Sequence, residues 1–299
     1  MSQNQITSIS ADVSIIEKLR AFIELLKLRL SFLVVFSSAF GYVLGSQDRI
    51  NWTSFLMFCI GGFMVSGGAV TLNQVFEINY DKVMKRTKNR PMPTSRVNAR
   101  EGIVYASILL GSGLFILLWF TNILTVILSI VSVIIYAFIY TPLKRVGPIA
   151  VLVGAIPGAL PPLLGWTAAT GGISYEGLII FGIQFIWQFP HFWAIAWIAD
   201  EDYKKAGFRL LPGNGKKDLN TAFQIMIYTL FLVPLGLLPT AFGLTGIYSG
   251  IIATVCGILF LAQTFKHMKN CTRNTALWIM YSSFLYLPIV QIAYLIDKI

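Results

Sequence analysis

Residues 54–76 read SFLMFCIGGFMVSGGAVTLNQVF, and residues 77–91 continue EINYDKVMKRTKNRP. The first stretch is apolar and long enough to cross, as a helix, the roughly 30 Å hydrocarbon core of a bilayer. The second is polar, acidic at its start and basic after it. Apolar stretches of similar length recur along the whole chain. The sequence therefore predicts a helical protein that crosses the membrane repeatedly, with polar chemistry at the helix ends.

The composition is that of a membrane protein. Of 299 residues, 56% are hydrophobic and only 12% are charged, whereas soluble domains carry about 25% charged residues. We therefore expect a single membrane-embedded domain over residues 29–299. Residues 1–28 mix acidic, basic and apolar side chains and lack a cleavage motif, which predicts an amphipathic segment on the membrane surface.

Nine membrane-spanning helices are expected, so the fold class is all-α and polytopic. The predicted spans are residues 29–47, 54–76, 102–120, 122–141, 148–167, 177–199, 221–243, 246–265 and 277–296. With a cytoplasmic N-terminus, the cytoplasmic segments and span ends hold all but two of the 23 Lys and Arg residues, the exceptions being Arg49 and Lys298. The positive-inside rule thus predicts a cytoplasmic N-terminus. It also explains the net charge of +10, so no nucleic-acid partner is expected.

The connections after spans two and six are the long ones, and both are polar, basic and on the predicted cytoplasmic side. Four spans separate them, which indicates a duplicated four-helix unit with one additional helix. Internal repeats of this kind place working sites at the interface between the repeats. We therefore expect the functional site where spans two and six end.

The end of span two carries Asn73, Glu77 and Asp81 at spacings of four residues. On a continuous helix these oxygen-bearing side chains form one stripe, and such hard ligands suit Mg²⁺ together with substrate phosphates. Cations that can bind phosphate oxygens follow at Lys85, Arg86, Lys88 and Arg90. A solvated helix end with a topogenic basic loop is the alternative. Asn73 argues against it, because an amide inside an apolar span requires a partner.

A second acidic group, Asp200, Glu201 and Asp202, follows span six, and a basic loop follows it in turn. This repeats the first arrangement in the equivalent position. Two acidic helix ends facing each other could hold Mg²⁺ on one diphosphate and neutralise charge on the leaving group. Allylic diphosphates ionise readily under those conditions and give a carbocation that an electron-rich carbon can attack. We expect metal binding from Asp200 or Asp202 and substrate contacts from Tyr203 and Lys204.

Two further features lie near the same end of the predicted bundle. His191, next to Pro190 in span six, has three interpretations: a packing residue, an axial ligand to a haem iron, or a hydrogen-bond partner of the substrate. Lys144 and Arg145 lie between spans four and five and either bind phosphate or carboxylate groups or only determine topology. Span five contains prolines within 157–162, which interrupt backbone hydrogen bonding and are tolerated only against protein or a cavity.

The combination of these motifs resembles the UbiA-type intramembrane prenyltransferases, and more narrowly the subfamily that farnesylates haem. The similarity extends over all the spans, and its specific motifs lie between about residues 71 and 212. These are the stripe with the MKRTKNRP sequence of 84–91, residues 140–145, GALPPLLGW of 158–166, WQFPHFWAIA of 187–196, and the Asp202-Tyr203 pair before Ala206-Gly207. Two departures stand out: Glu77 occupies a position where Asp is commoner, and the second acidic motif is compressed.

The resemblance implies a nine-helix bundle around a cavity open to lipid. It implies that farnesyl diphosphate is joined to a vinyl group of haem b, that water quenches the resulting cation, and that Mg²⁺ is the cofactor. Asn73, Glu77, Asp81 and Asp202 would be the catalytic residues. A bacterial inner membrane location with a cytoplasmic active site follows, as do contacts with other assembly proteins of haem–copper oxidases.

Two alternatives belong to different classes. A sibling prenyltransferase acting on a quinone precursor or a chlorophyll-type acceptor would share the first motif but has no need of PHFWAIA. A secondary transporter also contains repeats and broken helices, but it places its charged residues near the bilayer midplane. Here the carboxylates of interest lie at the inner ends of the spans, where a soluble diphosphate head would arrive.

Overall fold

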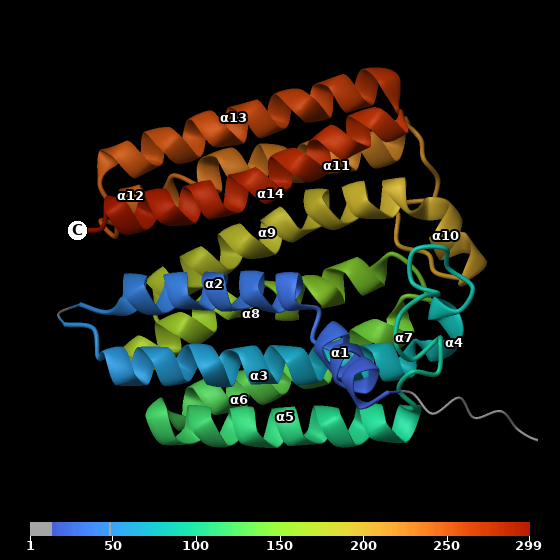
Figure 1. Cartoon of the computed structure of the whole chain (residues 1–299). Helices are drawn as coiled ribbons and strands as arrows, with labels where there is room; N and C mark the ends of the chain where they lie inside the picture. The colour runs from blue at the N-terminus through green and yellow to red at the C-terminus, as the bar shows by residue number, and fades with distance from the viewer. Residues whose placement is uncertain (1–13, 48) are drawn as a thin grey trace, which may run out of the picture.

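The structure, a computed structural model, describes residues 14–47 and 49–299. Its helices are α1 (Ile15–Leu25), α2 (Leu28–Gly45), α3 (Trp52–Phe76), α4 (Ile78–Asp81), α5 (Ala99–Phe120), α6 (Ile123–Ile134), the π-helix η1 (Ile135–Tyr140), α7 (Thr141–Leu143), α8 (Ile149–Thr170), α9 (Tyr175–Ile198), α10 (Asp200–Lys205), α11 (Leu219–Leu235), α12 (Leu238–Ala241), α13 (Ile247–Asn270) and α14 (Arg273–Ile296). Figure 1 shows the long helices lying side by side.

Nine of the described helical segments are long and apolar enough to cross a membrane, as the sequence predicts. They are α2, α3, α5, the continuous segment Ile123–Leu143, α8, α9, Leu219–Ala241, α13 and α14. The largest errors in the predicted edges fall at the connection of α13 with α14. There α13 continues to Asn270, and α14 already begins at Arg273. The chain is therefore a multi-pass, all-α membrane protein.

The predicted surface segment is only partly described, because residues 1–13 lie outside the described residues. From Ile15 the chain forms α1, whose apolar residues Ile15, Ile16, Leu19 and Ile23 are exposed while Ala21 and Leu25 are buried. A short helix with an exposed apolar face suits the membrane interface. It lies at the same end of the bundle as α4, α7 and α10 (Figure 1).

Polar side chains fix where several spans begin. Five described helices are capped by a side chain that accepts a hydrogen bond from the first turn: Asn51, Asn98, Asn122, Asp218 and Thr272. At α5 the cap is reciprocal, since Glu101 also accepts a bond from the backbone N–H of Asn98. Each cap satisfies a backbone donor that a helix start would otherwise leave unpaired.

Helices α2 and α8 pack at unusually close range in the middle of the bundle. A Cβ atom at Gly41 would overlap the backbone of Pro162, and one at Gly165 would overlap the backbone of Ser38. Small residues allow this approach, and in lipid such contacts replace the hydrophobic effect as a source of helix association. Helix α8 also packs on α9, and α14 packs on α2 and α9. These four helices surround the centre of the molecule.

The prolines of α8 alter its hydrogen bonding without interrupting the helix. Pro162 has no N–H to offer the carbonyl of Gly158 one turn earlier. That carbonyl accepts bonds from Gln184 Nε2 at 2.8 Å and from Gln188 Nε2 at 2.9 Å, both on α9. Pro162 therefore removes one hydrogen bond of the helix, as predicted, and α9 supplies the replacement donors.

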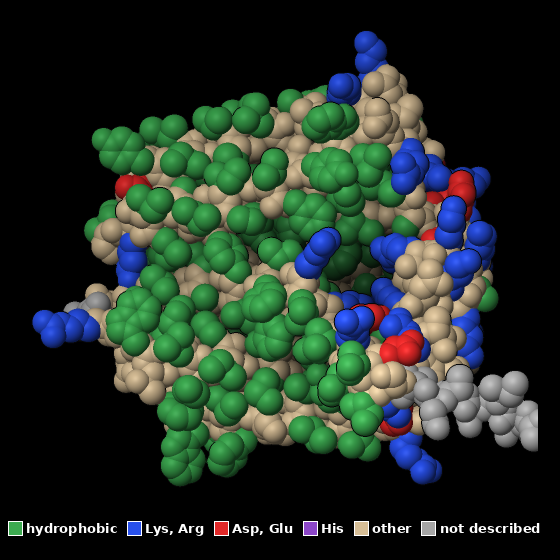
Figure 2. Space-filling view, in the orientation of Figure 1, with side chains coloured by type: hydrophobic (Ala, Val, Ile, Leu, Met, Phe, Trp, Pro, Cys, Tyr) green, Lys and Arg blue, Asp and Glu red, His purple; other side chains and the backbone are tan. Residues whose placement is uncertain are grey.

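Charge is distributed unevenly over the surface. Figure 2 shows a broad hydrophobic face along the helices and a concentration of Lys and Arg side chains at one end. That end carries α4 and α10, which follow the spans α3 and α9, and α7, which ends the span Ile123–Leu143 (Figure 1). The face is suited to lipid, and the basic end to the membrane surface.

Candidate active site

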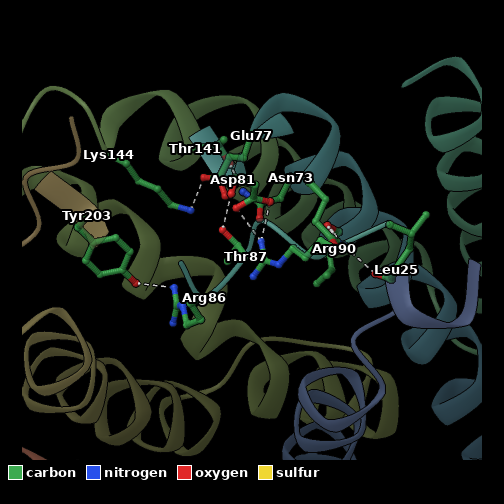
Figure 3. Close-up of polar contacts among 12 residues, drawn as sticks. Leu25, Asn73, Glu77, Asp81, Arg86, Thr87, Arg90, Thr141, Lys144 and Tyr203 are labelled. Carbon is green, nitrogen blue, oxygen red and sulfur yellow. Dashed lines mark hydrogen bonds and ion pairs between the residues drawn. The ribbon is translucent and has the colours of Figure 1, made fainter. Parts of the chain in front are cut away.

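The stripe formed by Asn73, Glu77 and Asp81 is buried at the end of α3. Helix α3 ends at Phe76, and Glu77 has φ −99° and ψ 6°, so the helix bends before α4. The spacing survives because Glu77 N donates to Asn73 O at 3.0 Å and Asp81 N donates to Glu77 O at 2.8 Å. The exposed fractions of the three residues are 2%, 5% and 0%. All three lie on one side of the chain, as Figure 3 shows.

Each member of the stripe has a polar partner. Lys144 Nζ lies 2.6 Å from Glu77 Oε1, and Arg90 Nη1 lies 3.0 and 2.8 Å from the two oxygens of Asp81. Asn73 Nδ2 donates to Thr141 Oγ1 at 2.9 Å. Figure 3 shows these partners converging from α3, α7 and the loop after α4. The stripe and the segment that carries Thr141 and Lys144 therefore form one cluster.

Lys144 remains a cation in this buried position. Burial alone would lower its pKa, but its neighbours Tyr140 and Glu77 outweigh burial and raise the pKa above the ordinary value. Its Nζ also lies 4.5 Å from the ring centroid of Tyr140, within cation–π range. Tyr140 ends the π-helical segment η1, a type of helical defect that often occurs at functional sites.

The second acidic group contacts the first loop through Asp202. Its two carboxylate oxygens accept hydrogen bonds from the backbone N–H groups of Lys85 and Arg86, each at 3.1 Å. Burial would raise the pKa of Asp202, but these two donors outweigh it and lower the pKa. The guanidinium of Arg86 donates to Tyr203 OH at 3.2 Å. Asp202 and Tyr203 thus join the loop after α4 to α10.

Asp200 has different partners. Lys204 Nζ lies 2.8 Å from its carboxylate, and Lys217 Nζ lies 3.4 Å from it. Of the predicted cations, five are exposed: Lys85, Arg86, Lys88, Arg145 and Lys204. Arg145 lies over the ring of Tyr80, 5.4 Å from its centroid, and lines a surface groove of about 490 Å³ together with Arg209.

The described residues contain no group of three or more His, Cys, Asp or Glu side chains arranged to hold a metal ion. The stripe nevertheless has the donor chemistry that Mg²⁺ requires, namely two carboxylates and an amide oxygen. Both carboxylates are neutralised by Lys144 and Arg90. Lysine and arginine side chains also bind phosphate oxygens. A magnesium diphosphate could therefore replace Lys144 and Arg90 as the partner of the two carboxylates. The residues fit Mg²⁺ bound together with phosphate.

Lys27 belongs to this region and was missed by sequence reasoning. It joins α1 to α2 in the left-handed backbone conformation, with φ 44°, which is rare for a residue other than glycine. Burial, followed by repulsion from Arg90, lowers its pKa to about 7. Glu77 and Asp81 act on it in the opposite direction. The sequence pattern could not have identified Lys27, because its position depends on how α1 packs against the bundle.

A largely apolar cavity of about 310 Å³ opens beside the cluster. Its lining comes from α2, α3, α5, α6, η1, α8, α9 and α14 and includes Tyr140 and His191. Figure 2 shows a hollow in the hydrophobic face near the basic end. His191 is 7% exposed, its Nδ1 lies 2.8 Å from Ser283 Oγ, and Trp187 stacks on its ring at 4.5 Å. Tyr140 therefore connects the ionic cluster to the cavity.

Comparison with known proteins identifies the family. Residues 34–287 match the sequence profile of the UbiA prenyltransferase family. The fold agrees: a solved digeranylgeranylglyceryl phosphate synthase superposes with a TM-score of 0.78 at 21% identity, covering 94% of this chain and 98% of the other. A UbiA homologue from Archaeoglobus fulgidus, bound to DMAPP and Mg²⁺, gives a TM-score of 0.64 at 16% identity, covering 91% and 98%. The chain belongs to the UbiA prenyltransferase family.

Sequence similarity narrows this class. A protoheme IX farnesyltransferase of Cytophaga hutchinsonii is 49% identical over 94% of this chain and 98% of its own length. That of Christiangramia forsetii is 41% identical over 100% and 98%. A mitochondrial protoheme IX farnesyltransferase of Arabidopsis thaliana is 36% identical over 94% of this chain and 65% of the plant protein. Within the family, the chain therefore groups with the protoheme IX farnesyltransferases, and the expected family is confirmed.

Proposed function

We propose that this enzyme converts haem b to haem O by transferring the farnesyl group of farnesyl diphosphate to a haem vinyl group. The observation that carries the proposal is the connection between the buried ionic cluster and the apolar cavity at Tyr140, which lines the cavity and lies 4.5 Å from Lys144 Nζ. An amphiphilic diphosphate needs both environments side by side. The similarity to protoheme IX farnesyltransferases supports haem as the acceptor.

The diphosphate would bind at the stripe. Asn73, Glu77 and Asp81 would hold Mg²⁺, which when bound neutralises charge on the diphosphate. Lys144 and Arg90, released from the carboxylates, would bind phosphate oxygens. Lys27, Arg86 and the exposed Lys85 and Lys88 would complete the cationic surround. The Archaeoglobus homologue bound to DMAPP and Mg²⁺ supports this pairing of metal with prenyl diphosphate.

The second acidic group would act mainly through Asp202. By accepting the backbone N–H groups of Lys85 and Arg86, it holds the loop that carries Arg86 and Arg90 over the stripe. Its remaining carboxylate lone pairs would be available to a metal ion. Asp200, Tyr203 and Lys204 would contribute through the same helix, with Tyr203 orienting Arg86.

Haem would occupy the cavity with its ring against aromatic side chains. On one wall, the ring of His191 contacts those of Trp187 and Phe284, with centroid distances of 4.5 and 4.8 Å. The propionates would reach the basic end, where Arg145 and Arg209 line the surface groove. The protein would contribute most to the rate by holding the vinyl carbon beside the allylic cation. Two reactants held in the reactive geometry have already lost the entropy that a collision in solution would cost.

The basic end would face the cytoplasm of a bacterial cell, with the protein in the inner membrane. The concentration of Lys and Arg at that end supports this orientation. Farnesyl diphosphate, a soluble head on a lipid tail, would then reach the stripe from the cytoplasmic surface and the cavity through the hydrophobic face.

Mass spectrometry of haems from cells that express the chain tests the proposal. The expected product is haem b with one added hydroxyl and one farnesyl group. A prenylated quinone precursor or chlorophyll-type pigment with unchanged haem b would instead establish the sibling prenyltransferase. A longer isoprenoid on haem would support haem as the acceptor but show that the donor is a longer prenyl diphosphate than farnesyl diphosphate.

A further inference from the structure

A polar strip runs through the apolar cavity on α9. Gln184, Gln188 and His191 are spaced four and three residues apart, so they share one face of the helix. All three line the cavity, and their exposed fractions are 4%, 4% and 7%. Buried polar side chains in a membrane protein require partners or a function.

The two glutamines differ in what their amide oxygens do. Gln184 Oε1 accepts hydrogen bonds from Ser37 Oγ at 2.7 Å and from Gln291 Nε2 at 3.0 Å. Gln188 uses only its nitrogen, which donates to Gly158 O at 2.9 Å. Within the described chain, Gln188 Oε1 has no hydrogen-bond donor. Gln188 lines the cavity, so this amide oxygen can accept a hydrogen bond from a ligand that enters it.

His191 presents a second acceptor to the same cavity. Ser283 Oγ carries one hydrogen, and it donates this hydrogen to Met280 O at 2.6 Å. The 2.8 Å contact between His191 Nδ1 and Ser283 Oγ must then be donated by Nδ1–H. In a neutral imidazole, this leaves His191 Nε2 unprotonated and free to accept. Trp187, nearly parallel to the imidazole at 16°, and Phe284 on its edge keep the ring in this orientation.

Both acceptors lie close to the diphosphate end of the cavity. On α8, Gly154 contacts the ring of Tyr140, and Gly158, one turn further along, contacts the amide of Gln188. Gln188 is thus about one helical turn, roughly 5 Å, deeper than Tyr140. Tyr140 is next to Lys144, which pairs with Glu77. A reacting carbon just beyond the diphosphate would lie at the depth of Gln188 and His191.

We propose that Gln188 Oε1 and His191 Nε2 hold the water molecule that terminates the reaction. This inference rests on the proposed function, which requires water to add to a carbocation inside an otherwise apolar cavity. A water that donates one hydrogen to each acceptor directs an oxygen lone pair at the cation. Two such partners are what a water needs to remain in a buried site.

The bonding changes are as follows. The C1–O bond of farnesyl diphosphate breaks, and diphosphate leaves with the electron pair. The π electrons of the vinyl group form a bond from its terminal carbon to farnesyl C1, which leaves a positive charge on the vinyl carbon next to the ring. The water oxygen bonds to that carbon, and its proton passes to His191 Nε2. Without the held water, the cation loses a neighbouring proton and forms a diene that is lighter by one water.

The ratio of hydroxylated to dehydrated farnesyl haem is therefore the property to measure, by mass spectrometry of the products. Gln188→Met and His191→Phe preserve size and remove one acceptor each. We expect the ratio to fall by roughly tenfold in either variant, the scale of losing one hydrogen bond. Because both products come from the same folded molecules, the ratio does not depend on how much variant protein folds.

Ser129→Ala is the matched control. Ser129 lines the same cavity, but its hydroxyl donates to Thr125 O at 2.8 Å. Its removal lowers the polarity of the cavity without changing Gln188 or His191, so the ratio should not change.

Two results would overturn the inference while leaving the proposed function intact. One is an unchanged product ratio in both acceptor variants. The other is a changed absorption spectrum of bound haem b in His191→Phe with an unchanged ratio, which would make His191 an iron ligand. A wild-type protein that forms no farnesylated haem at all would instead refute the proposed function.

Discussion

The two acidic groups each lie where a membrane span ends, the first at α3 and α4 and the second at α10 after α9, yet they have different surroundings. Glu77 and Asp81 are buried; Glu77 pairs with Lys144, which is 67 residues away, and Asp81 pairs with Arg90 of the following loop. Asp202 accepts backbone N–H groups, and Asp200 pairs with lysines of its own helix and the following loop. We therefore propose different roles for these two groups of acidic residues. The first binds the diphosphate, and the second holds the loop after α4 in place.

The largest difference between the two groups should appear on removing charge from the first. Asp81→Asn keeps the size of the side chain and removes its charge. We expect haem O formation to fall by roughly 100- to 1,000-fold, as when a group that stabilises developing charge is lost. The rate of haem O formation by purified enzyme checks this. Asp200→Asn is the matched control and should retain most of the activity; equal losses in the two variants would erase the distinction between the groups.

The two arginines of the loop sharpen the comparison, because one contacts each acidic group. Arg90 pairs with Asp81, whereas Arg86 contacts Tyr203. Since lysine cannot reproduce the planar fork of arginine, Arg90→Lys should raise the KM for farnesyl diphosphate by about tenfold or more. Arg86→Lys should have the smaller effect. Steady-state kinetics with varied farnesyl diphosphate separates these outcomes, and a lysine that serves equally well at both positions would reduce the loop to a topological role.

Bracing by Asp202 should be visible as stability. Asp202→Ala leaves the backbone N–H groups of Lys85 and Arg86 without their acceptor; because both bonds are exposed and water can replace the carboxylate, it should destabilise the protein by only about 1 kcal/mol. Thermal unfolding in detergent measures this loss. Asp202→Asn, which keeps one acceptor oxygen, should recover part of it. If both variants unfold like the wild type but bind no Mg²⁺ with the diphosphate, Asp202 is a metal ligand and the two groups are alike.

The smallest effect should be a pH dependence due to Lys27. Its pKa in the free protein is lowered to about 7, so the cation predominates below that pH and is lost above it. Farnesyl diphosphate affinity should therefore fall as pH rises above about 7, by at most about tenfold per pH unit for one proton. Stability of the free protein should change in the opposite direction, because the unfolded chain holds the proton up to its ordinary pKa of 10.5.

Binding measurements between pH 6 and 9 test this, with Lys27→Arg as the variant that keeps its charge. The pH dependence should disappear in that variant. A wild-type affinity that is flat across this range would show that Lys27 does not contact the diphosphate.

How much of this was predictable depends on the distance over which the contacts act. The spans and the spacing of Asn73, Glu77 and Asp81 follow from local periodicity, and they are present as predicted. The pairing of Glu77 with Lys144 joins residues 67 positions apart, and that of Asp202 with Lys85 joins residues 117 apart. Such partners are chosen by helix packing. The same holds for Ser283, which sets the protonation of His191 from α14.

Calorimetric titration with a non-hydrolysable farnesyl diphosphate analogue, with and without Mg²⁺, tests the central claim most directly. The account predicts Mg²⁺-dependent binding to the wild type and to Asp200→Asn, and little or no Mg²⁺-dependent binding to Asp81→Asn. Retained Mg²⁺-dependent binding in Asp81→Asn, with loss in Asp200→Asn, would contradict it.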